Sequence, residues 1–394
     1  MTIRKVSENV KWIGSIDWDR RLFDELIPLP DGTSYNSYFV EGSEKNMLID
    51  TIDPTKRDEL MNNLRKLGVK TIDYVVANHG EQDHSGSLRQ IIDEFGAEVL
   101  VNERGKDTTT SMVEVDSDET RVVEDGEEIS LGDLDVEFMI APWVHWPDTM
   151  FTYLKQDDVL FTCDYLGAHY ATSKLFVDDF EELRKPAKRY FAEIMMPFAS
   201  KSKSYIEDVR ELDPEIVAPS HGPLYDDPKI ILDAYSRWVN EEMKNKVVIP
   251  YVSMHGSTEK MVEYLTDSLI DKGVEVELFH MTSSDIGELA MALVDAATLV
   301  VGSPMVLGGA HPVMFYVSYL ANALKPNTKY LSVVGSFGWG GRMINQLSDN
   351  TKALSAELIE PVTSKGYPDN EDLESLDELA QKIAQKHENN ENVT

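Results

Sequence analysis

Cysteine is almost absent from the sequence, which contains one, Cys163, among 394 residues. A single thiol excludes an intramolecular disulfide, a cysteine-ligated iron–sulfur cluster and a four-cysteine zinc site. Cys163 lies within an apolar run, so we expect a small buried side chain rather than a ligand.

Long apolar runs are missing as well. No stretch approaches the roughly 18 uninterrupted apolar residues that a membrane span needs. The first residues, MTIRKVSENV, lack the apolar core of a signal peptide. We therefore expect a cytoplasmic protein that does not enter a membrane.

Basic residues are outnumbered, with 37 basic against 70 acidic side chains and a formal net charge of −33. This charge repels phosphate backbones, so nucleic acid is not expected as a partner. One basic cluster stands out, consisting of Arg184, Lys185, Lys188 and Arg189. It is either a solvated helix face or a docking patch for an acidic protein.

Ligand-type residues, in contrast, are concentrated in HGEQDHSG, residues 79–86, directly after the apolar run 74–77. This segment contains His79, Glu81, Asp83 and His84. So many imidazole and carboxylate groups in one short segment are hard to satisfy without a cation. The alternative is a solvated acidic turn with two incidental histidines, and further ligand-type residues along the chain weaken it.

The same arrangement, an apolar run that ends in a ligand-type residue, recurs three times. His145 follows 138–141 in VHWPD, Asp164 follows 159–163, and His221 follows 216–218 in PSHG. If these runs are neighbouring strands of one sheet, their ends form a common rim, where open α/β sheets place their sites. Six or seven ligands then converge at that rim. With His169, these segments contain all five histidines that precede residue 245.

Near residue 245 the sequence changes to a regular alternation of expected strands and helices. This change predicts one domain over 1–245 and a second over 246–390. In the second half, strands are expected at 247–252, 274–279, 297–302, 328–334 and 357–362, with helices between them. This alternation predicts an α/β fold with a doubly wound parallel sheet. The tail 391–394 is polar and is expected to fray.

Three loops of the second half predict a flavin site. The first, Ser253, Met254, His255, Gly256, Ser257 and Thr258, precedes a helix whose N-terminus favours a phosphate. No P-loop lysine or GxGxxG is present, which favours a monophosphate. Two further loops, with Ser303, Pro304 and Met305 and with Ser336, Phe337, Gly338, Trp339 and Gly340, suit the edges and faces of a flat ring. We therefore expect FMN; glycine turns beside a core tryptophan are the alternative.

The motifs HxExDH, HWPD, a strand-end aspartate, SHG, SMxGST and GSFGWGG together resemble those of the flavodiiron proteins, or A-type flavoproteins. The resemblance implies an N-terminal metallo-β-lactamase-like αββα sandwich followed by a flavodoxin-like domain. It also implies that one iron is held by His79, Glu81 and His145, the other by Asp83, His84 and His221, with Asp164 as a bridge and His169 as an orienting neighbour. Glu81 stands where zinc hydrolases of this fold usually carry histidine, which favours iron.

The function implied by the resemblance is reduction of O2 to water, of NO to N2O, or both, with electrons passed through FMN to two non-haem irons. No rubredoxin-like cysteine pairs are fused to this chain, so an external donor is expected, either a rubredoxin-type protein or reduced F420. The family implies a head-to-tail homodimer, or a dimer of such dimers. Two alternatives stay open: a zinc hydrolase with an attached flavodoxin domain, and a flavin electron carrier whose first domain is a scaffold.

Overall fold

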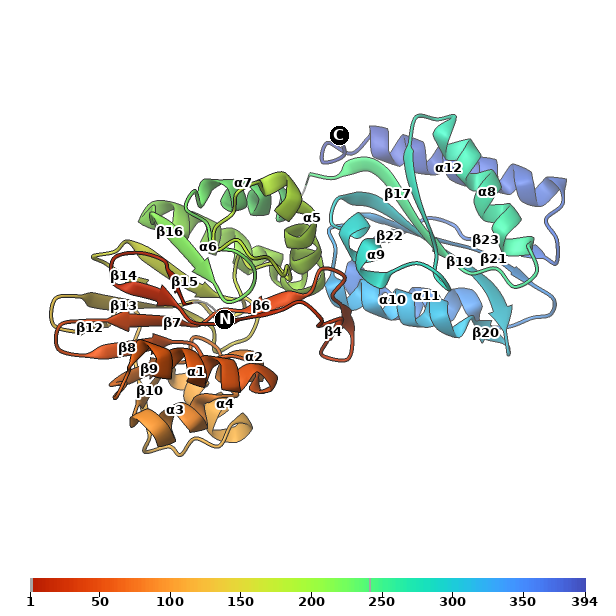
Figure 1. Ribbon diagram of the computed structural model, residues 1–394. Helices are drawn as coiled ribbons and strands as arrows, with labels where there is room; N and C mark the ends of the chain where they lie inside the picture. The colour runs from red at the N-terminus through yellow and green to blue at the C-terminus, as the bar shows by residue number, and fades with distance from the viewer. Residues whose placement is uncertain (1–2, 241) are drawn as a thin grey trace. The chain divides into compact units, whose positions relative to one another are not determined.

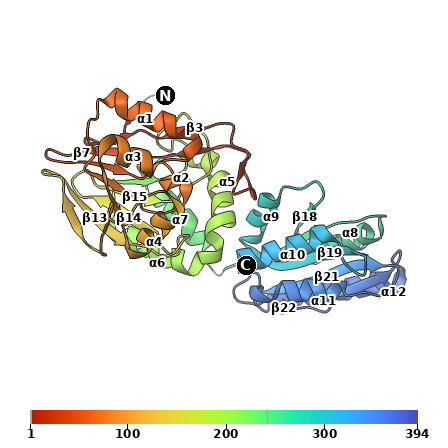
Figure 2. The ribbon, with the colours of Figure 1, turned by 90° about the horizontal axis from the view of Figure 1, so that it is seen from below.

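The computed structural model describes residues 3–240 and 242–394. The chain forms two compact units (Figures 1 and 2): the first extends to Phe191 and includes Phe198–Arg237, and the second comprises Ala192–Pro197 and Trp238–Thr394. The division at Trp238 lies ahead of the expected boundary at 245. No helix among the described residues has the length and apolar character needed to cross a membrane.

The first unit contains two β-sheets that pack face to face. The first sheet has the order β1 (Arg4–Lys5), β2 (Val10–Trp12), β7 (Tyr38–Glu41), β8 (Asn46–Ile49), β9 (Tyr74–Val76), β10 (Glu98–Val101) and β11 (Thr120–Val122). The second sheet has the order β12 (Glu128–Ser130), β13 (Asp135–Ile140), β14 (Met150–Leu154), β15 (Val159–Cys163) and β16 (Ile216–Pro219). The unit also has two small two-stranded antiparallel sheets. One pairs β3 (Ser15–Asp17) with β6 (Thr33–Tyr35), and the other is the hairpin of β4 (Leu22–Phe23) and β5 (Ile27–Pro28).

Helices cover the outer face of each sheet (Figure 1). The helices α1 (Arg57–Leu67), α3 (Leu88–Phe95) and α4 (Glu103–Met112) lie against the first sheet, and α5 (Phe180–Tyr190), α6 (Ala199–Leu212) and α7 (Lys229–Trp238) against the second. One apolar core, which includes Trp12 and Phe138, fills the space between the sheets. Another, which includes Leu64 and Ile91, lies beneath α1 and α3. The expected αββα sandwich is confirmed. Side chains along a strand such as β13 point alternately to the two faces of its sheet, so one face packs on the other sheet and the opposite face packs on helices.

The second unit is a parallel sheet with helices on both faces. Its strand order is β18 (Glu275–His280), β17 (Lys244–Tyr251), β19 (Ala296–Val306), β21 (Tyr330–Phe337) and β22 (Glu357–Leu358), with β23 (Val362–Lys365) also paired to β21. Counted from β17 this is the order 2-1-3-4-5 of a flavodoxin-like fold. One face carries α8 (Ser257–Ile270) and α12 (Asn370–Glu388), the other α9 (Ile286–Leu293), α10 (Pro312–Leu324) and α11 (Met343–Asn350) (Figure 1).

Two details differ from the expectation for the second half. β19 continues past residue 302 and turns back as a hairpin with β20 (Gly309–Ala310). The tail 391–394 does not fray: the Met243 N–H donates to the Asn392 carbonyl, and the Thr394 N–H donates to the Met243 carbonyl at 2.8 Å. The prediction of a frayed tail was wrong because polar side chains do not prevent the backbone from pairing with a distant segment.

Candidate metal centre and flavin site

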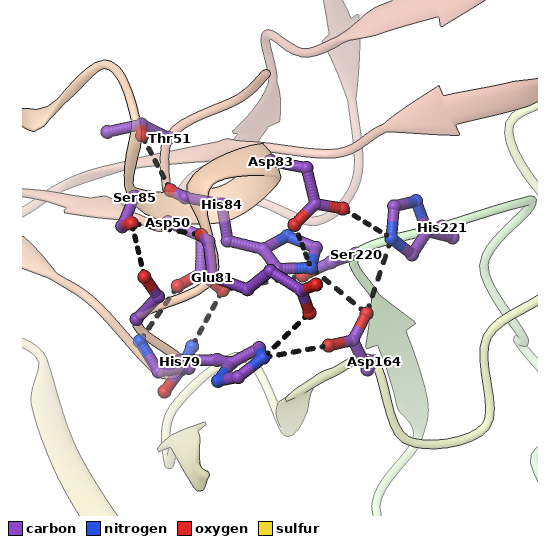
Figure 3. A network of polar contacts seen from close by, with 12 residues as sticks. Asp50, Thr51, His79, Glu81, Asp83, His84, Ser85, Asp164, Ser220 and His221 are labelled. Atoms are coloured by element: carbon purple, nitrogen blue, oxygen red, sulfur yellow. Dashed lines mark hydrogen bonds and ion pairs between the residues drawn. The ribbon is translucent and has the colours of Figure 1, made fainter. Parts of the chain in front are cut away.

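Ligand-type residues from both sheets of the first unit meet at one end of the sandwich (Figure 3). His79 and Glu81 follow β9, and Asp83 and His84 lie in the short helix α2 (Gln82–Ser85). The others come from the second sheet: His145 from the β13–β14 loop, Asp164 directly after β15 and His221 after β16. The three later runs lie in one sheet, where β15 and β16 are neighbours and β14 separates them from β13, whereas β9 belongs to the other sheet. They share an edge because the two sheets face each other.

The side chains form two groups, within each of which the candidate ligand atoms all lie within 4.8 Å of one another. One group contains His79, Glu81, His145 and Asp164; the other contains Asp83, His84 and His221. Asp164 faces both. Its Oδ1 lies 3.0 Å from His84 Nε2 and 3.2 Å from His221 Nε2, whereas its Oδ2 lies 3.4 Å from His145 Nε2. One carboxylate can therefore serve both groups at once.

Hydrogen bonds at the outer nitrogens orient two of the imidazoles. His79 Nδ1 lies 3.1 Å from Asp148 Oδ1, and His221 Nδ1 donates to the Ser34 carbonyl oxygen at 2.7 Å. With the proton on Nδ1, each ring turns its Nε2 lone pair inward. His221 Nε2 then meets Asp83 Oδ2 at 3.1 Å. Two lone pairs at this distance repel each other unless a proton or a metal ion lies between them.

Buried oxygens of the cluster also lack partners. Among the described residues, no hydrogen-bond donor serves either carboxylate oxygen of Asp83 or Oδ2 of Asp164. These side chains are 4 % and 3 % exposed, so bulk water does not solvate them. An unpaired buried carboxylate is costly, and a bound cation removes that cost. Four imidazoles and three carboxylates in two adjoining groups thus fit a pair of iron ions.

Without a cation, the cluster holds protons instead. Burial lowers the pKa of His145, but the neighbouring carboxylates of Asp164 and Glu81 outweigh burial and raise that pKa to about 9. His221 is likewise buried, and Asp164 and Asp83 raise its pKa to about 10. Burial opposes ionisation of Asp164, yet His84 and the other histidines hold the pKa of its carboxyl well below the usual range. A metal ion must therefore displace protons when it binds.

His169 lies beside the cluster rather than within it. Its ring centroid is 4.8 Å from that of His221, and its Nδ1 is 2.9 Å from Thr33 Oγ1. From α5, the Tyr190 hydroxyl donates to Asp164 Oδ1 at 3.0 Å. Neither this contact nor the role of Asp148 was predicted. Asp148 stands within the HWPD motif, which offered a signal, whereas nothing in the local sequence connects Tyr190 with Asp164.

The basic cluster on α5 is exposed in part. Arg189 is buried, with 4 % of its surface exposed, whereas Arg184 and Lys185 are exposed. Arg184 pairs with Glu181 at 2.8 Å. Both alternatives for this cluster, a solvated helix face and a docking patch for an acidic protein, stay predictions.

The three loops predicted to bind FMN lie together at the carboxyl edge of the second unit's sheet, because β17, β19 and β21 are adjacent and parallel. Gly256 has φ +83° at the start of α8, and Ser253 Oγ accepts from the N–H groups of Gly256 and Glu259, each at 3.2 Å. Thr258 Oγ1 lies 2.9 Å from Ser336 Oγ and so joins the first loop to the third. The other predicted residues lie in these positions: Met254 and His255 in the first loop, Ser257 at the first position of α8, Ser303, Pro304 and Met305 in β19, Phe337 at the end of β21, and Gly338, Trp339 and Gly340 directly after it.

Large apolar side chains surround this edge and face solvent. Met254 is 48 % exposed, Leu307 94 %, Trp339 67 % and Tyr367 66 %, and each lies in a loop that follows a different strand. Exposed apolar residues in a common rim indicate a surface that another group covers. The rim and the helix N-terminus together fit a flat aromatic ring with a phosphate. Leu307 and Tyr367 were not predicted, since single apolar residues in turns carry no local signal.

Comparison with known proteins agrees with this arrangement. A family described as ODP family beta lactamase matches residues 33–222, and the flavodoxin family matches residues 249–378. A nitric oxide reductase from Moorella thermoacetica is 35 % identical over 390 residues, which cover 96 % of this chain and 97 % of that protein.

Solved structures extend the similarity to the whole chain. The rubredoxin oxygen:oxidoreductase of Desulfovibrio gigas has a TM-score of 0.93 and 31 % identity and covers 98 % of both chains. The flavodiiron protein of Giardia intestinalis has a TM-score of 0.88 and 26 % identity, over 100 % of this chain and 99 % of that one. Both domains, in this order and over this length, make the chain a member of the flavodiiron family, also called the type A flavoproteins.

Proposed function

We propose that this oxidoreductase, whose cofactors are FMN and a non-haem diiron centre, reduces O2 to water, NO to N2O, or both, with electrons from an external donor. The observation that supports the proposal most strongly is the position of Asp164, whose two carboxylate oxygens face two separate groups of ligand-type residues. A shared carboxylate keeps two metal ions near enough to act on one diatomic molecule.

The proposed ligands follow the two groups. One iron is assigned to His79, Glu81 and His145, the other to Asp83, His84 and His221, with Asp164 shared between them. Carboxylates make up a large part of these ligands, which favours iron over zinc. When bound, the irons supply open positions for a diatomic molecule, and the flavin supplies stored electrons.

The protein's own residues hold this centre and restrict access to it. Asp148 fixes the His79 ring, and the Ser34 carbonyl fixes the His221 ring. The Trp146 ring lies 4.8 Å from the His79 ring and the Phe23 ring 5.2 Å from the His169 ring, measured between centroids. These aromatic side chains pack beside the cluster and exclude water from it on two sides.

Electrons are proposed to come from a rubredoxin-type protein, in line with the name of the Desulfovibrio gigas relative, with reduced F420 as the alternative donor. The flavin of one copy is proposed to serve the metal centre of another in a head-to-tail homodimer. A size measurement tests this directly: a fully active monomer would contradict it.

The central test quantifies iron, zinc and FMN in purified protein, reduces it anaerobically, and compares its consumption of O2 and NO. We expect two irons and one FMN per chain and rapid loss of at least one gas. His79→Ala is expected to abolish gas consumption while the flavin still accepts electrons. His280→Ala, a histidine in the second unit, is the matched control.

The same measurements separate the alternatives. Two zinc ions per chain with esterase or thiolesterase turnover would support a hydrolase. Undiminished gas consumption by His79→Ala would support a flavin carrier with a scaffold domain. Either result would refute the proposed function.

A further inference from the structure

A pocket of about 230 Å³ adjoins the predicted flavin edge of the second unit. Met305, Phe337 and Gly340, from the second and third of the predicted flavin loops, contribute to its lining, together with Thr363 of β23. Pockets for whole small molecules measure roughly 300 to 1,000 Å³, whereas a water molecule occupies roughly 30 Å³ in the liquid. The pocket therefore suits a single side chain of several heavy atoms.

The pocket contains a cation, Arg342, which is the single arginine of residues 246–394. Its backbone N–H donates to the Gly308 carbonyl oxygen at 2.9 Å, and its carbonyl oxygen accepts from the Gln346 N–H at 2.9 Å. These bonds fix the position of the residue and leave its guanidinium unused. The side chain is exposed and forms no ion pair with any residue that the structure describes.

A second cation, Lys365, borders the same pocket. It ends β23, where it stands opposite Phe337 in the parallel register, and the Gly366 N–H donates to the Phe337 carbonyl oxygen at 2.9 Å. Side chains two positions apart in a strand share a face, so Lys365 lies on the face of Thr363, which lines the pocket. Lys365 is exposed as well, and within residues 3–240 and 242–394 it has no acidic partner.

Two cations without partners stand out in a chain whose formal net charge is −33. Two aspartates in loops of the same edge are engaged elsewhere: Asp285 accepts from the Gly287 N–H at the start of α9, and Asp369 accepts from the Asp372 N–H at the start of α12. Most lysines of the second unit pair with acidic side chains, namely Lys244, Lys246, Lys272, Lys352, Lys382 and Lys386. The charges at the pocket therefore stay available to an anion from outside the chain.

Exposed apolar side chains surround the pocket. Leu307 precedes Gly308, and a Cβ on Gly308 would stand 3.7 Å from the Trp339 ring, so the two apolar residues adjoin. Tyr367 lies two positions after the second cation. Aromatic residues and arginine are enriched at protein interfaces, whereas a small molecule enclosed in the pocket would leave this rim in water. The surface as a whole thus fits a protein with acidic side chains.

We propose that this surface docks the electron donor, and that the donor is an acidic one-electron carrier protein. One of its carboxylates enters the pocket beside Arg342, and another lies near Lys365. The inference rests on the proposed function, in which FMN takes electrons from an external donor, and it selects a protein over F420. Two reduced carriers are oxidised for each FMN that is reduced, and the two protons that FMN takes up come from solvent.

Docking is tested on the full-length protein loaded with iron and FMN, with a reduced acidic rubredoxin as the probe. Anaerobic stopped-flow absorbance measures flavin reduction, and calorimetry measures binding of the oxidised rubredoxin. The variants are Arg342→Gln, Arg342→Glu and Lys365→Glu. Lys325→Glu is the matched control, because Lys325 is exposed, has no ion pair in the described part of the chain, and follows the last residue of α10 at the opposite edge of the sheet.

We expect Arg342→Gln to slow flavin reduction by rubredoxin and to weaken its binding by about tenfold, and the two charge reversals to do so by more. Wild-type rates should fall as salt rises, and those of the variants should fall less steeply. Lys325→Glu should match the wild type. Photoreduction, which needs no docking, should reduce the flavin equally in all proteins, with unchanged FMN contents.

Wild-type rates with rubredoxin in both charge reversals would overturn the proposal, as would a wild type that rubredoxin neither binds nor reduces. Dissociation of the oligomer in the variants would assign the surface to a second copy of the chain and so contradict docking of a carrier. Reduction by F420 with a KM that Arg342→Glu raises would assign the pocket to a small molecule. If Arg342→Glu loses FMN, Arg342→Gln and Lys365→Glu decide. A photoreduced wild type that consumes neither gas contradicts the proposed function alone, since the docking measurements involve no gas.

Discussion

Replacing Asp148 by Asn should weaken one of the two proposed iron positions selectively. The Asp148 carboxylate is 1 % exposed; its Oδ1 lies 3.1 Å from His79 Nδ1, and its Oδ2 accepts from the Gly80 N–H at 2.8 Å. Asparagine offers one oxygen in place of two, so it satisfies either the imidazole or the backbone N–H and turns an NH2 group towards the other. The His79 ring then loses its fixed orientation or its preferred proton position.

The size of the expected loss of iron affinity follows from comparable contacts in other metal sites. Loss of a carboxylate behind a ligating imidazole lowers metal affinity by about 10- to 100-fold. In free energy this is about 1.4 to 2.7 kcal/mol. The effect should fall on the iron assigned to His79, Glu81 and His145, because the Asp148 carboxylate bonds with His79 and with the Gly80 N–H on that side of the cluster.

Anaerobic dialysis against a series of chelators of increasing strength measures the two irons separately. Wild-type protein should release both at similar chelator strength, whereas Asp148→Asn should release one iron per chain early and keep the other. Asp73→Asn is the matched control, since Asp73 accepts from the Asn46 N–H at 2.8 Å and does not contact the cluster. Equal release from wild type and Asp148→Asn, or equal weakening of both irons, would refute the reasoning.

Three further outcomes are expected. Binding of Fe2+ to metal-free protein at pH 7 should release protons, because His145 and His221 have pKa values of about 9 and 10, and a weakly buffered titration should find this release shrinking as the pH rises towards 10. Burial lowers the pKa of His387 to about 4, so its neutral form stabilises the second unit fully above about pH 6.5 and progressively less as the pH falls towards 4. Between pH 7.5 and 5, the free energy of unfolding of the wild type should therefore fall by about 2 kcal/mol more than that of His387→Gln. Paired thermal melts measure this difference. In Gly335→Ala the new Cβ would stand 2.1 Å from the Ser303 carbonyl oxygen, so β19 and β21 must separate, and fluorescence titration should find weaker FMN binding.

Much of the metal centre was predictable because its ligands are local in sequence or end recognisable strands. The segment from His79 to His84 contains four of them, and apolar runs mark the places of Asp164 and His221. The pairing of strands depends on residues far apart in the sequence, so a local pattern does not reveal it. The structure places β9 in a different sheet from β15 and β16.

Residues that act through long-range contacts escaped sequence reasoning for the same physical reason. Tyr190 lies 26 positions from the carboxylate that its hydroxyl contacts. The polar composition of the tail 391–394 indicated a frayed terminus, and only its hydrogen bonds with the distant residue Met243 show that it is ordered.

The paired tail has a practical consequence for engineering. Thr394 is hydrogen-bonded beside the start of β17, whereas the flavin edge lies at the other end of that strand. Eight residues of strand span roughly 25 Å at about 3.3 Å each. An electron carrier fused to the C-terminus would therefore begin at the wrong end of the sheet, and a flexible linker of about 20 residues is the shortest whose average reach matches that span. A shorter tether would hold such a carrier away from the flavin that it is meant to reduce.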